Sequence, residues 1–303
     1  MDAAIRPATT EEDLQAWLAV RNAVDPRPLT LAGLRAERSS AHTILDLVAA
    51  VDARTAGAGS VGWGPLGEES GNVTIELWVL PDVRRHGIGG SLFERLVTFA
   101  REGAKTRLTT WVPAGNTASI SFLERRGLHV DGVAQLGHLG LTTVEADAAG
   151  SPDPPTLASF SERPDLERDV YDLDILVRPE IPYLRDEPLP SFDAWHGTVA
   201  GDPGFMADLS IIALDAGRVV GAIEIYDSAD AAVFIGMTAV HPDTRRRGVG
   251  RAMKVELARR ARAAGVRRIE TANDGANERI RGLNESLGYV YDPPFVTMRG
   301  PVP

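Results

Sequence analysis

Two short segments of this chain combine residue types suited to holding a phosphate group. Residues 81–89 read Pro-Asp-Val-Arg-Arg-His-Gly-Ile-Gly, and residues 242–250 read Pro-Asp-Thr-Arg-Arg-Arg-Gly-Val-Gly. In each segment, cations precede a Gly-x-Gly turn, and apolar residues at helical spacing follow it. Glycines let backbone N–H groups approach an anion closely, while the arginines and the helix dipole add positive charge. Each segment therefore predicts a pyrophosphate-binding loop.

The position of the cations supports this prediction. A helix N-terminus carries partial positive charge, so acidic side chains stabilise it and basic ones do not. The alternative is a solvated charge run beside an ordinary turn, which a second copy in the same surroundings disfavours. Neither segment ends in Gly-Lys-Ser/Thr, and both lack the third glycine of a dinucleotide fold. The residues predicted to hold the pyrophosphate are Arg84, Arg85, His86, Gly87, Ile88, Gly89 and Gly90, and in the second copy Arg245, Arg246, Arg247, Gly248, Val249, Gly250 and Arg251.

The two segments belong to a longer repeat with a constant offset. Pro242 lies 161 residues after Pro81 (242 minus 81), and further identities share that offset. These pairs are Arg107 with Arg268, Thr110 with Thr271, Asn116 with Asn277, Glu124 with Glu285, and Gly127 with Gly288. The repeat predicts a duplicated domain, with domains at 1–146 and 157–303 and a Pro- and Gly-containing linker at 147–156.

The elements that must position these loops follow from hydrophobic periodicity. An apolar strand precedes each loop, and an amphipathic helix follows it. For the first half we expect a strand at 5–7, helices from residue 10, at 29–38 and at 117–126, and strands at 43–52, 59–64 and 107–113, with a closing strand pair at 128–133 and 139–144. For the second half we expect helices at 164–176, 191–199, 250–264 and 276–287, a hairpin over 209–226, and a strand at 267–272. The predicted class is α/β (α+β): two tandem domains, each with a mixed, mainly antiparallel sheet flanked by helices.

Composition excludes several classes of function. The chain has 303 residues, 44% of them hydrophobic and 24% charged, which is typical of globular domains. It contains no cysteine, which excludes disulfides, thiolate zinc sites and a cysteine nucleophile. The net charge of −10 argues against a nucleic-acid partner. No long apolar run, secretory leader, His-x-x-x-His pair or Gly-x-Ser-x-Gly elbow occurs, so we expect a cytoplasmic protein with no membrane partner, no metal and no serine hydrolase site.

The loops and their surroundings resemble a known family. Arg84-x-x-Gly87-x-Gly89 and Arg245-x-x-Gly248-x-Gly250 are similar to the acetyl-CoA signature of the GNAT superfamily of N-acetyltransferases. The preceding strand and the later Asn before a helix that ends in glycine agree with that family. The resemblance covers nearly all of both halves, and it implies acetyl-CoA as the cofactor, with one molecule for each half.

The resemblance also implies roles for individual residues. Val79 and Val240 would expose backbone groups to the pantetheine arm at a splayed strand, and Asn116 and Asn277 would hydrogen-bond the pantetheine. Many members carry a tyrosine four residues before the helix-ending glycine, which reprotonates the leaving thiolate. Leu123 and Asn284 occupy those positions here, so this chain departs from the family at its general acid.

Candidates for the base come from strand positions. Glu76 lies on the strand before the first loop, but Met237 occupies the equivalent position in the second half. There the candidate is Glu224, between two isoleucines on the preceding strand, with Tyr226 beside it. A strand glutamate is often simply exposed to solvent, so this alternative stays open. The tyrosines that could replace the missing acid, with packing as the alternative, are Tyr226, Tyr289 and Tyr291.

Together these features predict an acetyl-CoA-dependent N-acetyltransferase that transfers acetyl directly to a primary amine of a small molecule. One alternative is an acetyltransferase similar to mycothiol synthase, which shares the tandem layout. Another is a non-catalytic acyl-CoA-binding regulator, because both helix tyrosines are missing. If one half is active, the Asn-rich run 273–284 favours the second. The sequence leaves the acceptor and the oligomeric state open.

Overall fold

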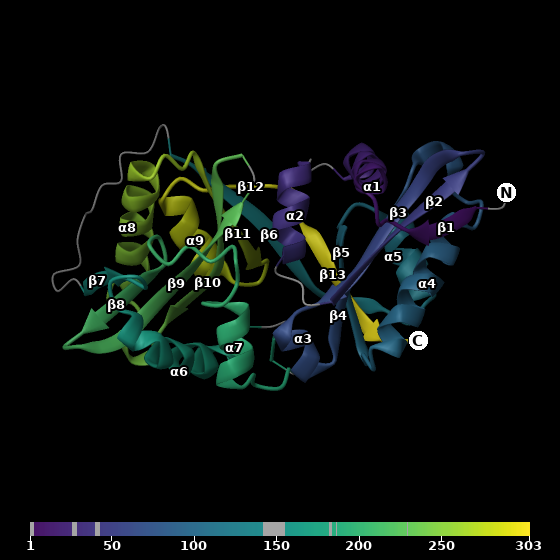
Figure 1. Cartoon of the computed structure of the whole chain (residues 1–303). Coiled ribbons are helices and arrows are strands. Elements are labelled where there is room, and N and C mark those ends of the chain that lie inside the picture. The colour runs from purple at the N-terminus through teal and green to yellow at the C-terminus, as the bar shows by residue number, and fades with distance from the viewer. Residues whose placement is uncertain are drawn as a thin grey trace. The chain divides into compact units, whose positions relative to one another are not determined.

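The structure is a computed structural model that describes residues 3–25, 29–39, 43–141, 155–181, 184–185, 187–228 and 230–303. The chain forms two compact units (Figure 1). The first unit comprises Met1–Asp131 and Thr297–Pro303, and the second comprises Gly132–Val296. Within the predicted linker, residues 147–154 lie outside the described residues.

The first unit is a mixed sheet in the order β1-β2-β3-β4-β5-β13. Strands β1 to β4 pair antiparallel, and β4 pairs parallel with β5. The elements are β1 (Ala4–Pro7), α1 (Glu11–Val24), α2 (Leu31–Ser39), β2 (Thr43–Val51), β3 (Arg54–Trp63), α3 (Pro65–Ser70), β4 (Asn72–Val79), α4 (Ile88–Glu102), β5 (Arg107–Pro113), α5 (Thr117–Glu124) and β13 (Phe295–Pro301).

Local sequence explains how the first unit is assembled. Thr10 and Asp13 form a capping box that starts α1. One turn later, Trp17 is buried against Trp78 of β4, with ring centroids 5.2 Å apart in an edge-to-face arrangement. On α4, Leu92 is fully buried at helical spacing from its apolar neighbours, so this face packs against the sheet. Both packed layers hold β4 and the loop after it in place.

The second unit is a mixed sheet in the order β6-β11-β10-β9-β8-β7, with the short β12 paired to β6. The β10–β11 pair is parallel, and the other described pairs are antiparallel. The elements are β6 (His129–Gly140), β7 (Thr156–Ser159), α6 (Glu167–Val177), a 3-10 turn η3 (Arg178–Glu180), α7 (Phe192–Thr198), β8 (Ile211–Asp215), β9 (Arg218–Ser228), β10 (Ala232–Val240), α8 (Val249–Ala263), β11 (Arg268–Asp274), α9 (Glu278–Ser286) and β12 (Val290–Tyr291).

Helices cover both faces of this second sheet (Figure 1), and a hydrophobic cluster lies on each face. On one face, Met253 and Leu257 of α8 pack on strand residues such as Ile223. On the other face, Leu173 of α6 and Trp195 of α7 pack on the same strands, and Trp195 is fully buried. Burial of apolar area on both faces stabilises β9 and β10 at the centre of the unit.

The predicted fold class, a tandem of two mixed sheets flanked by helices, is confirmed. The predicted closing strand pair at 128–133 and 139–144 is wrong where the structure describes it, because β6 is one continuous strand that pairs with β11 from Ala134 to Gly140. Residues 142–144 lie outside the described residues. The sequence patterns also missed α3, β7, β12 and β13. From Gly132 onward β6 belongs to the second unit, and Thr297–Pro303 belongs to the first. The domain limits 1–146 and 157–303, drawn from the sequence repeat, stay a prediction.

Candidate functional site

Strands β10 and β11 separate partway along their length. Their parallel pairing runs from Ala232 with Arg268 to Ile235 with Thr271. Beyond this point β10 continues to pair with β9 on its other side, up to Val240. The separation opens a cavity of about 670 Å³, which residues 235–240 of β10 and residues 271–274 of β11 line. A backbone edge is thereby presented to the cavity.

A β-bulge lies at the mouth of this separation. The register between β9 and β10 shifts between Ile235 and Met237, which leaves Gly236 as the extra residue. A Cβ at Gly236 would lie 2.5 Å from Cε2 of Tyr226, so a side chain there would displace the tyrosine ring. Gly236 lines the cavity, and its lack of a side chain leaves room for the ring of Tyr226.

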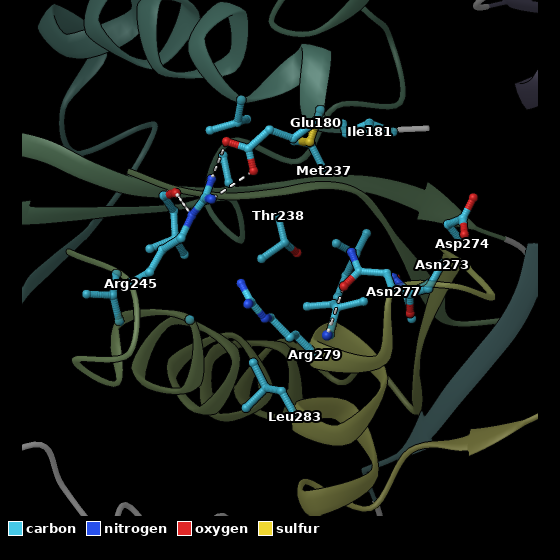
Figure 2. Close-up of a pocket in the computed structure, with 18 of the residues that line it drawn as sticks. Glu180, Ile181, Met237, Thr238, Arg245, Asn273, Asp274, Asn277, Arg279 and Leu283 are labelled. Atoms are coloured by element: carbon cyan, nitrogen blue, oxygen red, sulfur yellow. Dashed lines mark hydrogen bonds and ion pairs between the residues drawn. The ribbon is translucent and has the colours of Figure 1, made fainter. Parts of the chain in front are cut away.

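The cavity ends at the start of α8, where the second predicted phosphate loop lies. Gly248 caps the helix with φ of 84°, in the left-handed region, and Arg246 also has a positive φ of 67°. Because glycine has no side chain to cap the helix, the first N–H groups of α8 are left for an anion. Arg245 donates from Nε to the carbonyl of Val240 at 3.1 Å, and its two Nη atoms pair with Glu180 at 2.8 and 3.1 Å (Figure 2).

The first unit repeats this loop geometry closely. Gly87 caps α4 with φ of 89°, and Arg85 has φ of 68°. Arg84 donates from Nε to the carbonyl of Val79 at 2.9 Å, and Nδ1 of His86 lies 3.3 Å from the carbonyl of Val83. The sequence repeat therefore corresponds to a repeated glycine-capped helix start, and its role in binding pyrophosphate stays a prediction.

The structure brings most predicted binding residues of the second unit to the cavity wall. Predicted residues in the lining are Val240, Arg245, Arg246, Gly248, Val249, Gly250, Arg251 and Asn277. Asn277 also caps α9, because its Oδ1 accepts from the N–H of Ile280 at 3.3 Å, and Asn116 caps α5 in the same way. Their predicted contact with pantetheine stays a prediction.

Several lining residues escaped the sequence reasoning. Figure 2 shows Arg279 extending into the cavity between Thr238 and Leu283, with Asn273 and Asp274 toward the end away from Arg245. A comparison of the two halves at the 161-residue offset could have found Arg279 and Gly236, since Ala118 and Ile75 occupy the equivalent positions. Val177, Glu180 and Ile181 come from a segment without a repeated pattern, and no signal marked them.

Glu224 lies on β9, the strand next to the cavity-lining β10, and belongs to a buried cluster of charged residues. It is 5% exposed and stands opposite the lining residue Met237 in the strand register. Asp174 of α6 is buried beside it and pairs with Arg178 at 2.8 Å. Burial, and then the negative charge of Asp174, raise the pKa of Glu224 to about 8. The hydroxyl of Tyr226 hydrogen-bonds to Glu224, and burial raises the pKa of that tyrosine.

The predicted catalytic residue of the first unit has a different environment. Glu76 is half-buried on β4 and stands opposite Ser60 in the register. Its side chain is on the sheet face of Trp78, which packs against α1. The register of β3 with β4 is uninterrupted from Gly62–Thr74 to Gly57–Val79. A bulge therefore distinguishes the second site from the first.

Metal chemistry and membrane spanning receive no support from the described residues. Among them, no group of three or more His, Asp or Glu side chains is arranged to hold a metal ion. Within the same part of the chain, no helix has both the length and the apolar character needed to cross a membrane.

A strand pair that separates above a glycine-capped helix, as in the second unit, agrees with the family that the sequence resembles. The model of the acetyltransferase (GNAT) family matches residues 9–128 and 169–289. The chain therefore belongs to the GNAT acetyltransferase family, and the predicted family and tandem layout are confirmed.

Solved structures support the same fold. The GCN5-related N-acetyltransferase from Sphaerobacter thermophilus aligns with a TM-score of 0.75 at 18% identity, covering 99% of this chain and 96% of that chain. A tandem GNAT protein from the clavulanic acid biosynthesis pathway aligns with a TM-score of 0.73 at 21% identity, covering 100% and 99%. At these identities the likeness shows the fold alone. A search of curated proteins found no match.

Proposed function

We propose that this chain is an acetyl-CoA-dependent N-acetyltransferase that acts on a primary amine of a small molecule by direct transfer, with its working site in the second unit. The observation that carries the proposal is the cavity between β10 and β11, which ends at the glycine-capped start of α8. An elongated ligand with a diphosphate at one end and a thioester at the other matches both ends.

The residues present fit CoA. A Cβ at Gly250 would meet Leu283 at 3.5 Å and Val240 at 3.7 Å, so the glycine leaves space beside the helix N-terminus for a phosphate. Residues 237–240 of β10 face the cavity along an edge that β11 no longer pairs. The amides of pantetheine can hydrogen-bond that edge as an added strand would.

The chemistry divides among the protein's own groups. Bound acetyl-CoA supplies an acetyl group activated as a thioester. Glu224 is the proposed base, because a pKa of about 8 makes its ionised form a stronger proton acceptor than an ordinary carboxylate. Since it lies behind Met237, we propose that it takes the amine proton through one water. Backbone N–H groups at the bulge of Gly236 are the proposed donors to the developing oxyanion.

An amine acceptor agrees with the charge at the thioester end. Asp274 lies in the lining at the end away from Arg245, which is on the diphosphate side (Figure 2). A carboxylate near the reacting end attracts an ammonium group and raises its local concentration. This arrangement supports a small cationic amine as the acceptor class.

The test is a thiol-release assay with acetyl-CoA and a panel of small amines, together with calorimetry of CoA binding. We expect heat of binding with up to two CoA molecules per chain, and thiol release with at least one amine. Binding without turnover on any amine would instead establish a non-catalytic acyl-CoA-binding protein. Absence of binding heat would reject CoA altogether.

One observation favours a second candidate function for the first unit. Its loop keeps the anion-binding geometry, but β4 has no register shift, and Leu123 replaces the helix tyrosine. We propose that the first unit binds acyl-CoA without turning it over. An acetyltransferase similar to mycothiol synthase stays an alternative because of the tandem layout. Amines that resemble the substrate of that enzyme, included in the panel, would test it.

A further inference from the structure

The two phosphate loops differ in charge, although the helices that follow them start alike. The second loop carries Arg247 and Arg251, and the equivalent positions of the first loop hold His86 and Gly90. Both α4 and α8 nevertheless begin with a glycine cap in the left-handed region. The first loop therefore lacks arginines at two positions of an otherwise repeated backbone.

An arginine from a different helix lies where Gly90 leaves room. Arg126 follows α5, and a Cβ at Gly90 would lie only 3.3 Å from Nη2 of Arg126. Gly90 belongs to the first turn of α4, directly after the predicted phosphate loop. Glycine at this position thus lets a guanidinium lie against the start of the helix.

The second unit brings an arginine to the same junction from the opposite helix. Arg251, in the first turn of α8, donates from Nη1 to Oγ of Ser286 at the end of α9, at 3.2 Å. Arg251 also lines the cavity together with the rest of its loop. At the offset of 161 residues, Arg251 corresponds to Gly90, and Leu287 corresponds to Arg126. Each unit therefore places an arginine between these two helices, but from opposite sides.

The surroundings of Arg126 hold its guanidinium in place without neutralising it. The guanidinium lies 3.7 Å from the ring centroid of Phe122, and Nη1 donates to the carbonyl of Phe122 at 3.1 Å. Among the described residues, no carboxylate forms an ion pair with Arg126, and its buried Nε has no hydrogen-bond partner. Burial lowers the pKa of Arg126, and the charge of Glu94 on α4 opposes that shift. An anionic ligand would stabilise this partly desolvated cation.

Packing alone does not account for the exchange between the two units. Leu287 fills the position of Arg126 in the second unit and packs against the hydrophobic core there. That solution avoids the cost of burying a charge. The first unit instead keeps a charge beside a helix start whose first N–H groups have no partner within the helix. A phosphate at that start would pair with both the N–H groups and the guanidinium.

We propose that Arg126 binds a phosphate group of CoA in the first unit and takes the place that Arg251 has in the second. This inference rests on the proposed function, in which both units bind CoA. Arg126 lies outside the glycine-rich segment at 81–89, so the sequence motif does not mark it. A guanidinium donates parallel hydrogen bonds to phosphate oxygens, and its contacts with Phe122 orient it before the ligand arrives.

Calorimetry of CoA binding tests the assignment in a parent chain that carries Gly250→Asp, which places a carboxylate in the second loop and leaves the first unit to bind. Arg126→Leu introduces the residue that the second unit has at this position. We expect it to weaken CoA binding about tenfold, because a hydrogen bond between charged groups is lost. Arg125→Leu is the matched control, because Arg125 is exposed and its loss changes the net charge equally. The affinity of this control should stay within about twofold of the parent.

A second substitution separates binding from packing. Adding Gly90→Arg to Arg126→Leu moves the arginine to the helix that carries it in the second unit. A side chain fits at position 90 in this double variant, because the close neighbour of its Cβ is the Arg126 guanidinium itself. We expect the affinity to return to within about threefold of the parent. A double variant as weak as Arg126→Leu would show that Arg126 acts through packing, and this would overturn the proposal.

A comparison of two ligands identifies the phosphate group. Dephospho-CoA lacks the 3′-phosphate of CoA and keeps the diphosphate. A loss of affinity for CoA alone assigns Arg126 to the 3′-phosphate, and an equal loss for both ligands assigns it to the diphosphate. If Arg126→Leu binds both ligands as tightly as its parent, the inference is wrong while CoA binding by the first unit stands. No heat from the parent with either ligand would reject CoA binding by the first unit, and the inference with it.

Discussion

Strands β4 and β10 occupy equivalent places in the two units, yet they differ where chemistry would occur. In β4, Ile75 is buried in an uninterrupted register with β3. In β10, the equivalent Gly236 is a bulge beneath Tyr226. The helix-end loops that follow are nearly superposable in their dihedral angles, with Gly87 at 89° and Gly248 at 84°. The glycine-capped helix start is preserved in both copies, whereas strand geometry is not.

Buried side chains on the helices beside the two sites also differ between the units. Phe93 of α4 is buried at the position that Lys254 occupies on α8, and Leu123 is buried where α9 has Asn284. A backbone N–H site tolerates such changes because it needs only glycines and a helix end. A catalytic site does not, because it needs titratable groups at fixed places. On our proposal, the two units would share ligand binding, and the second unit would carry the chemistry.

The largest effect should come from placing a carboxylate in either phosphate loop. A Cβ at Gly89 would meet its nearest neighbour at 3.6 Å, and one at Gly250 at 3.5 Å, so aspartate fits at both positions. An acid near a helix N-terminus also favours the fold. Since like charges in contact cost several kcal/mol, we expect CoA binding to the altered unit to weaken about 1,000-fold.

The two aspartate variants separate the units. Gly250→Asp should abolish thiol release and leave one binding event in calorimetry, while Gly89→Asp should keep most of the turnover. Circular dichroism and thermal melting show that each variant is folded. Equal loss of turnover in both variants would mean that the units are catalytically equivalent, which would end the assignment to the second unit.

The next effect should come from the buried carboxylate of the second unit. A base must be ionised to work, so kcat of the parent should rise with pH through the raised pKa of Glu224, about 8. Glu224→Gln should lower kcat about 100-fold and remove that limb of the profile. Glu76→Gln in the first unit should change kcat less than tenfold. Both variants are measured by thiol release from pH 6 to 10. A larger loss of kcat in Glu76→Gln than in Glu224→Gln would indicate that Glu76 is the base.

The repeat and the loops were predictable because they depend on local residue types. Gly87 and Gly248 each mark the start of a helix, whatever elements surround it. The course of β6 was not predictable from the sequence, because nothing in residues 128–144 distinguishes one long strand from a hairpin. The hydrogen bonds among Asn273, Asn284 and Tyr291 were not predictable either, since they depend on the ring of Tyr291 lying over Gly137, a contact between residues distant in sequence.

A smaller effect, on stability, should come from the lysine that replaces phenylalanine on α8. Lys254 is 3% exposed, and among the described residues nothing hydrogen-bonds its Nζ, which lies 5.3 Å from the ring centroid of Tyr289. Burial lowers its pKa to about 7. Lys254→Met should raise the free energy of unfolding by about 3 kcal/mol at pH 6, because a buried ammonium is removed.

The pH dependence of that gain distinguishes charge from packing. Between pH 7 and the ordinary lysine pKa of 10.5, the unfolded chain binds a proton that the folded chain lacks, so parent stability rises with pH. The advantage of Lys254→Met should therefore shrink at pH 10 in urea denaturation. Phe93→Met in α4 is the control, with a pH-independent loss of about 1 kcal/mol. A gain that is equal at pH 6 and pH 10 would contradict the buried charge.

The smallest effect should come from the ion pair that holds Arg245. Glu180 and Arg245 are 52% and 33% exposed, and exposed pairs contribute about 0–1 kcal/mol. Because a diphosphate at α8 competes with Glu180 for the guanidinium, Glu180→Gln should raise CoA affinity of the second unit about threefold. Salt screens exposed charges, so the gain should fade at high ionic strength in calorimetry. Arg84 makes the same Nε bond to Val79 in the first unit, whose affinity should not change. A fall in affinity would instead show that Glu180 holds Arg245 in the orientation that binds the diphosphate. The loop of the second unit would then depend on a side-chain ion pair for its geometry.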